Sequence, residues 1–109
     1  MPIRPSDGPV PAEKRRRLRA RAHRLKPVVI VGSSGVTSGV TAALEQALED
    51  HALIKIRVKA DDRVRRREII DELCTACRAH PIQIIGHVAV LFREPKDESL
   101  RAALSEILN

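Results

Sequence analysis

The sequence predicts a single α/β domain, a sandwich in which helices pack on a four-stranded mixed sheet. Stretches with a helical apolar period alternate with short strand-like runs, in the order α-β-α-β-α-β-β-α. The 109 residues are enough for one domain, and 43% of them are hydrophobic. Phe92 is the only Phe, Tyr or Trp in the chain, so the core has to be aliphatic.

The N-terminal part divides into a leader and a helix. Residues 1–11 contain four of the seven prolines, which predicts a disordered leader. The helix that follows has Leu18, Ala22 and Leu25 along one narrow apolar edge, and Pro27 is expected to end it. Cations cover the rest of this segment, and the candidate phosphate contacts among them are Arg15, Arg16, Arg19, Arg24 and Lys26.

A strand and a glycine-rich loop come next. Val28 to Val31 is a short, wholly apolar run, typical of a strand buried on both faces. The loop Gly32-Ser33-Ser34-Gly35 leads into a second helix, which Thr37 or Ser38 can cap. Backbone N–H groups at a helix start bind anions, so this layout predicts a phosphate-binding loop. The inward positions of the helix are Val40, Leu44, Ala47 and Leu48.

Residues 53–59 alternate between apolar and cationic side chains, which predicts a half-buried strand. Its inner positions are Ile54, Ile56 and Val58, and its outer positions are Lys55, Arg57 and Lys59. A third helix is expected over residues 63–79. Cations in its first turns oppose the helix dipole, so they serve either a binding role or form a solvated cluster. These cations are Arg63, Arg65, Arg66 and Arg67.

The last part of the chain predicts a hairpin and a short helix. Two apolar strands, residues 82–85 and 88–92, flank Gly86-His87, where glycine can supply a positive φ. Beyond Pro95 a short amphipathic helix is expected, with Asp97 or Ser99 as its cap.

The positive charge is concentrated near the N-terminus. Residues 1–26 carry nine Lys or Arg against two acidic residues, a net charge of +7, whereas residues 27–109 carry eleven against twelve, a net charge of −1. This asymmetry indicates a polyanionic partner, either nucleic acid or a membrane surface. No stretch approaches the ~18 apolar residues of a membrane span, and no apolar signal region is visible, so we expect a cytoplasmic protein.

The sequence contains no convergent catalytic or metal-binding set, so we expect no catalytic residue, metal or cofactor. Cys74 and Cys77 form one CxxC pair with only His80 nearby, and they share a helical stripe with Ile70 and Leu73. We therefore expect both thiols in the core. The GSSG loop lacks the Lys of a P-loop and the GxGxxG spacing of a dinucleotide site.

A GXXG loop can instead clamp the backbone of a single-stranded nucleic acid, as in KH domains. Glycine lets the backbone approach closely, and Ser33 and Ser34 add hydroxyl donors. RNA-binding sheets of other kinds need exposed aromatic side chains, which this chain does not have. Recognition is therefore expected to rest on phosphate, ribose and shape.

Three stretches together resemble, in order, YhbY-type proteins: AHRLKPVVIVGSSGVTSGV, ALEQALEDHALIKIRV and IQIIGHVAVLFR. These proteins are the bacterial stand-alone form of the CRM (chloroplast RNA splicing and ribosome maturation) domain. The similarity covers about Leu18 to Arg93. It implies a fold similar to the C-terminal domain of translation initiation factor three, with GSSG at the position of the family's GXXG loop. It also implies binding to precursors of the large ribosomal subunit, as for bacterial members, or to introns, as for plant relatives.

The leading hypothesis is a non-catalytic protein that binds ribosomal RNA during assembly of the large (50S) subunit. We expect a leader over residues 1–11, a CRM-type RNA-binding domain over 12–94 and a helical extension over 95–109. In this hypothesis the partner is RNA, and the protein binds neither a membrane nor a small-molecule substrate. Two alternatives stay open: an intron or small RNA as the target, and a small phosphate-handling enzyme.

Overall fold

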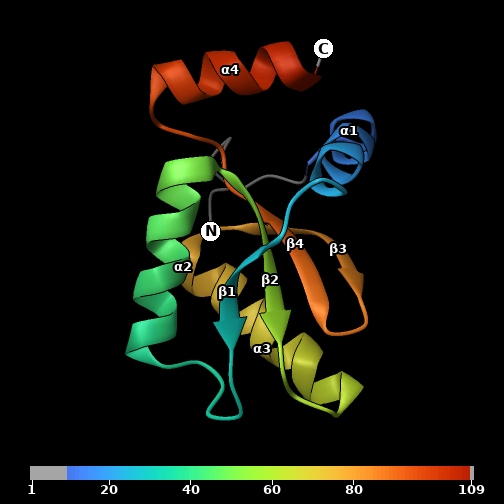
Figure 1. The fold of residues 1–109 in the computed structure, drawn as a ribbon, viewed down its shortest axis with the longest axis vertical. Coiled ribbons are helices and arrows are strands. Elements are labelled where there is room, and N and C mark those ends of the chain that lie inside the picture. The colour runs from blue at the N-terminus through green and yellow to red at the C-terminus, as the bar shows by residue number, and fades with distance from the viewer. Residues whose placement is uncertain (1–9, 109) are drawn as a thin grey trace, which may run out of the picture.

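Within residues 10–108, which the computed structural model describes, the chain forms four helices and one four-stranded sheet (Figure 1). The leader predicted for residues 1–11 therefore lies almost wholly outside the described residues. The elements are α1 (Ala12–Ala22), β1 (Pro27–Val31), α2 (Ser38–His51), β2 (Leu53–Val58), α3 (Arg63–Cys77), β3 (His80–Ile85), β4 (Val88–Phe92) and α4 (Glu98–Leu108).

The sheet is mixed and has the strand order β1-β2-β4-β3. β1 and β2 run parallel with α2 as the crossover between them, and β4 is antiparallel to both of its neighbours. The β3–β4 hairpin turns at Gly86, whose φ of 56° lies in the left-handed region that glycine tolerates. This topology confirms the predicted α/β class with a mixed sheet.

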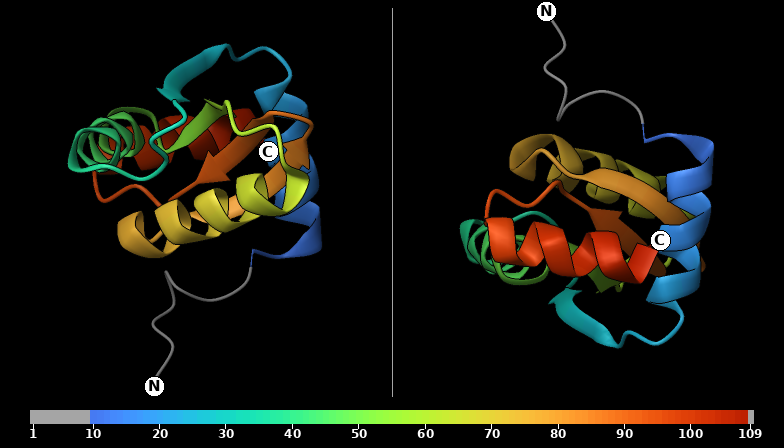
Figure 2. Two further views of the ribbon diagram at one scale, coloured as in Figure 1. Left: turned by 90° about the horizontal axis from the view of Figure 1, so that it is seen from below. Right: turned by 90° about the horizontal axis from the view of Figure 1, so that it is seen from above.

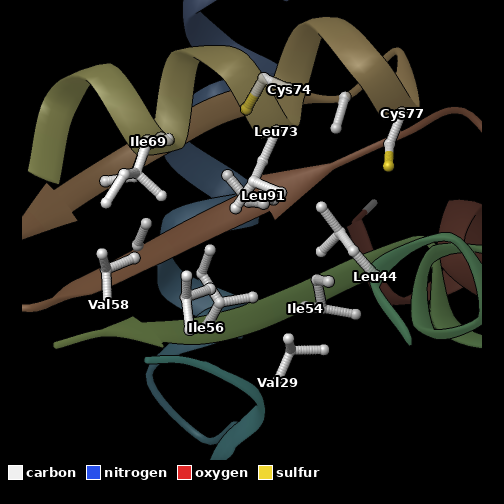
Figure 3. Close-up of a cluster of buried hydrophobic side chains, with 14 of the residues drawn as sticks. Val29, Leu44, Ile54, Ile56, Val58, Ile69, Leu73, Cys74, Cys77 and Leu91 are labelled. Carbon is white, nitrogen blue, oxygen red and sulfur yellow. The ribbon is translucent and has the colours of Figure 1, made fainter. Parts of the chain in front are cut away.

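α2 and α3 cover one face of the sheet and enclose the larger part of the core (Figure 3). Leu44 of α2 and Leu73 of α3 are fully buried there. The inward side chains of β2 are Ile54, Ile56 and Val58, as the alternation predicts. Cys74 and Cys77 belong to the same cluster, which confirms that both thiols are core residues.

The other face carries a second, smaller cluster beneath α1. Leu18 and Ala22 of α1 are buried there together with Phe92 of β4. α4 crosses this end of the molecule, from α2 toward α1, and packs two leucines against the same cluster (Figure 2). The carboxylate of Asp97 accepts a hydrogen bond of 2.9 Å from the N–H of Leu100, which confirms Asp97 as the cap.

β1, an edge strand, is open on one face, so the prediction that it is buried on both faces is wrong. Val29 and Val31 point into the core, but Val28 and Ile30 are 54% and 57% exposed. The reason is that α1 packs over β2 and β3 and leaves the outer side of β1 open. β-branched residues suit a strand with one open face as well as a buried one, and an apolar run does not distinguish the two.

α1 ends at Ala22, earlier than the predicted stop at proline. The N–H groups of His23, Arg24 and Leu25 bond to carbonyls three residues back, so the chain tightens into a turn before β1 begins. Leu25 is half-buried and still packs against the second cluster. The apolar spacing therefore continues beyond the end of the helix, and for this reason the predicted helix was longer than the observed one.

Candidate nucleic-acid interface

The GSSG loop forms a tight turn between β1 and α2, at the lower end of the molecule in Figure 1. The N–H of Gly35 donates to the carbonyl of Gly32 at 3.0 Å, and Ser33 and Ser34 are exposed at the tip. Gly35 is buried with a φ of 71°, where a side chain would strain the backbone. Gly32 has open space where a Cβ would lie. The turn therefore presents two hydroxyl groups to solvent, and the positive φ of Gly35 allows the backbone to form this turn.

α2 begins directly after this turn and its N-terminus faces the same end of the molecule. The side chain of Thr37 accepts a hydrogen bond of 3.1 Å from the N–H of Val40, which confirms Thr37 as the cap. The first turn of α2 contains no acidic residue, so no side chain offsets the positive end of the helix dipole. An anion bound at the turn would be stabilised by this field.

The start of α3 lies against the same turn, which was not predicted from the sequence. A Cβ atom on Gly35 would lie 3.1 Å from Nη2 of Arg65, so this guanidinium packs beside the loop. The pair between Arg65 and Glu68 is exposed and 3.4 Å long, and such pairs contribute little. The signal in the sequence was a run of arginines at a helix start, where cations oppose the dipole.

Two other arginines of this cluster have structural partners. Arg66 donates to the carbonyls of Ala60 and Asp61 at 3.0 and 2.8 Å, and its Nη1 lies 3.4 Å from Nε2 of His87. It thereby holds the β3–β4 hairpin against the loop before α3. Arg67 forms an ion pair of 3.1 Å along α3, with Asp71. The cluster thus contains one arginine beside the loop, Arg65, one that holds the hairpin, Arg66, and one in an exposed pair within α3, Arg67.

Lys55, Arg57 and Lys59 follow the open face of β2 as a row of cations. The N–H of Lys59 donates to the carbonyl of Val31 at 2.9 Å, which puts Lys59 beside the end of β1 and the GSSG turn. At ~3.3 Å per residue, the row extends about 13 Å from Lys59 to Lys55. Within residues 10–108, none of the three forms an ion pair with a carboxylate.

Aliphatic side chains flank this row on the open face of the sheet. Ile30 and Ile85, on the two edge strands, are 57% and 61% exposed. The strand registers place one residue from each strand side by side in a single line: Ile30, Arg57, Val88 and Ile85. No helix lies in front of the lower half of the sheet in Figure 1. The cations of β2 are therefore part of a mixed apolar and basic surface.

The cations of α1 lie at the opposite end of the sheet from the GSSG turn (Figure 1). Arg15 is half-buried and donates to the carbonyls of Pro81 and Ile82 at 2.9 and 3.2 Å, so its guanidinium anchors α1 to β3. Arg16 pairs with Glu13 at 2.6 Å, and this hydrogen bond lowers the pKa of the Glu13 carboxyl. Both arginines already have partners within the fold.

The remaining predicted cations differ in exposure. Arg19 of α1 is half-buried, whereas Arg24 and Lys26 are exposed in the turn that leads into β1. Among the predicted cations, Lys59 lies beside the GSSG turn, and Arg57 and Lys55 continue from it along β2. The structure keeps the α1 arginines apart from that turn.

Cys74 and Cys77 are both buried. Burial raises the pKa of the Cys74 thiol to about 12 and raises that of Cys77 as well. Such thiols stay protonated near neutral pH and are poor nucleophiles. No group of three His, Cys, Asp or Glu side chains within residues 10–108 is placed to hold a metal ion. In the same range, every helix is too short or too polar to cross a membrane.

Comparison with protein families extends the resemblance found in the sequence. Residues 11–93 match the CRS1 / YhbY (CRM) domain, which is most of the chain. The chain belongs to the CRM domain family. This confirms the resemblance that the three sequence stretches suggested, and it places the GSSG turn, β2 and the start of α3 within the CRM domain.

Relatives of this CRM-domain protein are similar over most of their length. The Pseudomonas aeruginosa protein named "Probable RNA-binding protein PA4753" is 43% identical over 82 residues, which cover 75% of this chain and 79% of that protein. A Haemophilus influenzae protein named "RNA-binding protein" is 43% identical over 82 residues, covering 75% and 82%. The solution structure of SAV1595 from Staphylococcus aureus has a TM-score of 0.74 and 28% identity, over 83% of this chain and 94% of that one.

Proposed function

We propose that this CRM-domain protein binds RNA without catalysing a reaction, and that its target is ribosomal RNA of the 50S subunit during assembly in the cytoplasm. The observation that carries the proposal is the exposed GSSG turn with Arg65 and Lys59 beside it. The names of the P. aeruginosa and H. influenzae relatives support RNA as the ligand. The ribosomal target rests on the resemblance to YhbY-type proteins.

The chemistry of the turn suits a sugar-phosphate backbone. The hydroxyls of Ser33 and Ser34 donate to phosphate or ribose oxygens, while Arg65 and Lys59 neutralise the charge nearby. Phe92, the only Phe, Tyr or Trp side chain, is buried, so bases have no platform of that kind on which to stack. Ile30 contacts ribose and base edges instead. Recognition therefore follows the backbone and the shape of the RNA more than its sequence.

The test places two carboxylates at the tip of the turn. The variant Ser33→Asp/Ser34→Asp should bind fragments of large-subunit ribosomal RNA at least about tenfold more weakly, because carboxylates repel phosphate where donors are needed. The matched control, Thr75→Asp/Ala76→Asp, adds the same charge on exposed positions of α3, about 15 Å along the helix from Arg65. Fluorescence anisotropy measures affinity, and thermal unfolding measures the stability of each variant, because carboxylates in the last turn of α3 oppose the helix dipole. Equal affinities of the two variants would make the turn purely structural.

A second experiment identifies the target. Cross-linking in cells and sequencing of the bound RNA should recover large-subunit ribosomal RNA, and the protein should sediment with 50S precursors. Recovery of an intron or a small RNA instead would overturn the ribosomal target but leave RNA binding standing. Release of phosphate from nucleotides by the purified protein would overturn the non-catalytic function.

A further inference from the structure

A pocket of about 390 Å³ lies at the end of the molecule away from the GSSG turn. Its walls are the end of α1 and the turn after it, the start of β1, the end of α2, the first residues of β2, and α4. α4 crosses this end of the molecule (Figure 2). The volume falls within the ~300–1,000 Å³ of small-ligand sites. The match to the CRM domain ends at residue 93, so the α4 wall is added by a segment beyond that domain.

The lining of this pocket combines an apolar floor with a cationic rim. Leu25, Leu53 and Leu104 form part of the floor. The cations that line it are Arg21, Arg24, Lys26 and Lys55. No carboxylate lines the pocket, and within residues 10–108 none of the four cations forms an ion pair. Four cations without a carboxylate beside an apolar floor suit an occupant that is anionic on one side and apolar on another.

We propose that this pocket takes one nucleotide of the bound RNA, with its base against the leucines and its phosphate among the cations. The inference rests on the proposed RNA-binding function and adds a second contact site to it. Lys55 connects the two sites, because it lines the pocket and also begins the β2 row that leads to Lys59 at the GSSG turn. An RNA strand that follows this row reaches from the turn to the pocket.

The charge pattern favours a nucleotide over other occupants. An apolar peptide would cover the leucines but bring no negative charge to the rim, and it would bury the half-buried Arg21 and Lys55 further without partners, which is costly. A simple anion would satisfy the rim but leave the floor in water. A nucleotide satisfies both, since its base supplies an apolar face and its phosphate supplies the charge.

The first test uses two exposed neighbours on α4. Ala103 lines the pocket, whereas Ala102 does not. Ala103→Glu puts a carboxylate into the rim and should weaken binding of single-stranded ribosomal RNA fragments about tenfold. Ala102→Glu carries the same charge on the same helix and should stay near wild-type affinity. Equal affinities of the two variants would overturn the pocket as a binding site.

The second test probes the pocket without RNA. In nuclear magnetic resonance titrations, 5′-AMP should shift the backbone signals of Lys55 and Leu104, and adenosine or inorganic phosphate alone should shift them much less. Equal shifts with phosphate alone would reduce the pocket to a simple anion site, and no shift with AMP would overturn it. If these backbone signals shift with protein concentration in the absence of AMP, the occupant of the pocket is a second copy of the chain and the nucleotide proposal is wrong. Loss of RNA binding in the GSSG variant with AMP binding retained would separate the two sites.

Discussion

A Cβ atom on Gly35 would lie 3.1 Å from Nη2 of Arg65, so the GSSG turn and the start of α3 touch at this point. The contact joins two segments thirty residues apart in sequence. It places a guanidinium beside a turn whose tip carries two hydroxyls, and a Cβ atom at Gly35 would have to push this guanidinium aside by a few tenths of an ångström. Gly35 therefore has two roles. It adopts a positive φ that the turn needs, and it leaves space for the guanidinium of Arg65.

Gly35→Ala should destabilise the protein by about 1–2 kcal/mol, because a side chain at a φ of 71° strains the backbone. The new methyl group should also displace Arg65 and weaken RNA binding. Gly32→Ala is the matched control, since its Cβ would meet open space, and its stability should change by less than about 0.5 kcal/mol. Chemical unfolding followed by circular dichroism measures both. An equal loss in the two variants would contradict the assignment.

RNA binding should depend steeply on salt, and the slope should report which cations touch phosphate. Replacing both Arg57 and Lys59 by Gln should reduce the slope of log K against log salt by about 0.7 for each lost contact with a single strand. Arg15→Gln is the comparison, because the Arg15 guanidinium is already bonded to two carbonyls of β3. It should lower stability and leave the slope unchanged. If the slope falls only in Arg15→Gln, the RNA contacts lie on α1 and not on the β2 row.

Local patterns were enough to predict most of the fold. The alternation in β2, the cap at Thr37 and the turn at Gly86 each depend on residues close in sequence, and the structure confirms all three. The exposure of Ile30 was missed because it depends on where α1 packs. The early end of α1 was missed because a turn keeps Leu25 against the same cluster that a longer helix would have reached.

The candidate site was only partly predictable. The GXXG motif and the β2 row are local features, so the sequence indicated the turn and its neighbouring cations. The position of Arg65 beside Gly35 depends on the packing of α3 against the loop, which no local pattern encodes. Arg15 was predicted from charge alone to contact RNA, and no local pattern indicated that its guanidinium bonds to the carbonyls of Pro81 and Ile82.

Arg93 should contribute strongly to stability. Its side chain is only 15% exposed, and its guanidinium donates to Glu45 at 2.8 Å, to Glu49 at 3.1 Å and to the carbonyl of Cys77 at 3.1 Å. Arg93→Met keeps the aliphatic stem but loses these bonds, so it should lower the free energy of unfolding by about 2 kcal/mol. Glu49→Ala removes only one exposed partner and should cost less. Equal losses in urea unfolding would show that the bonds to Glu45 and to the Cys77 carbonyl contribute nothing.

The buried thiols should make stability fall as the solution becomes alkaline. Burial raises the pKa of Cys74 to about 12, whereas an unfolded cysteine titrates near ~8.5. The folded state therefore holds its proton where the unfolded state loses it, so this contribution is complete below pH ~8.5 and declines above it. Cys74→Ala should cost about 1 kcal/mol at pH 7 and show a smaller decline between about pH 8 and pH 9.5. Because the chain has no Tyr, no phenol complicates this range. Urea unfolding followed by circular dichroism measures the difference, and an identical decline in wild type and variant would contradict it.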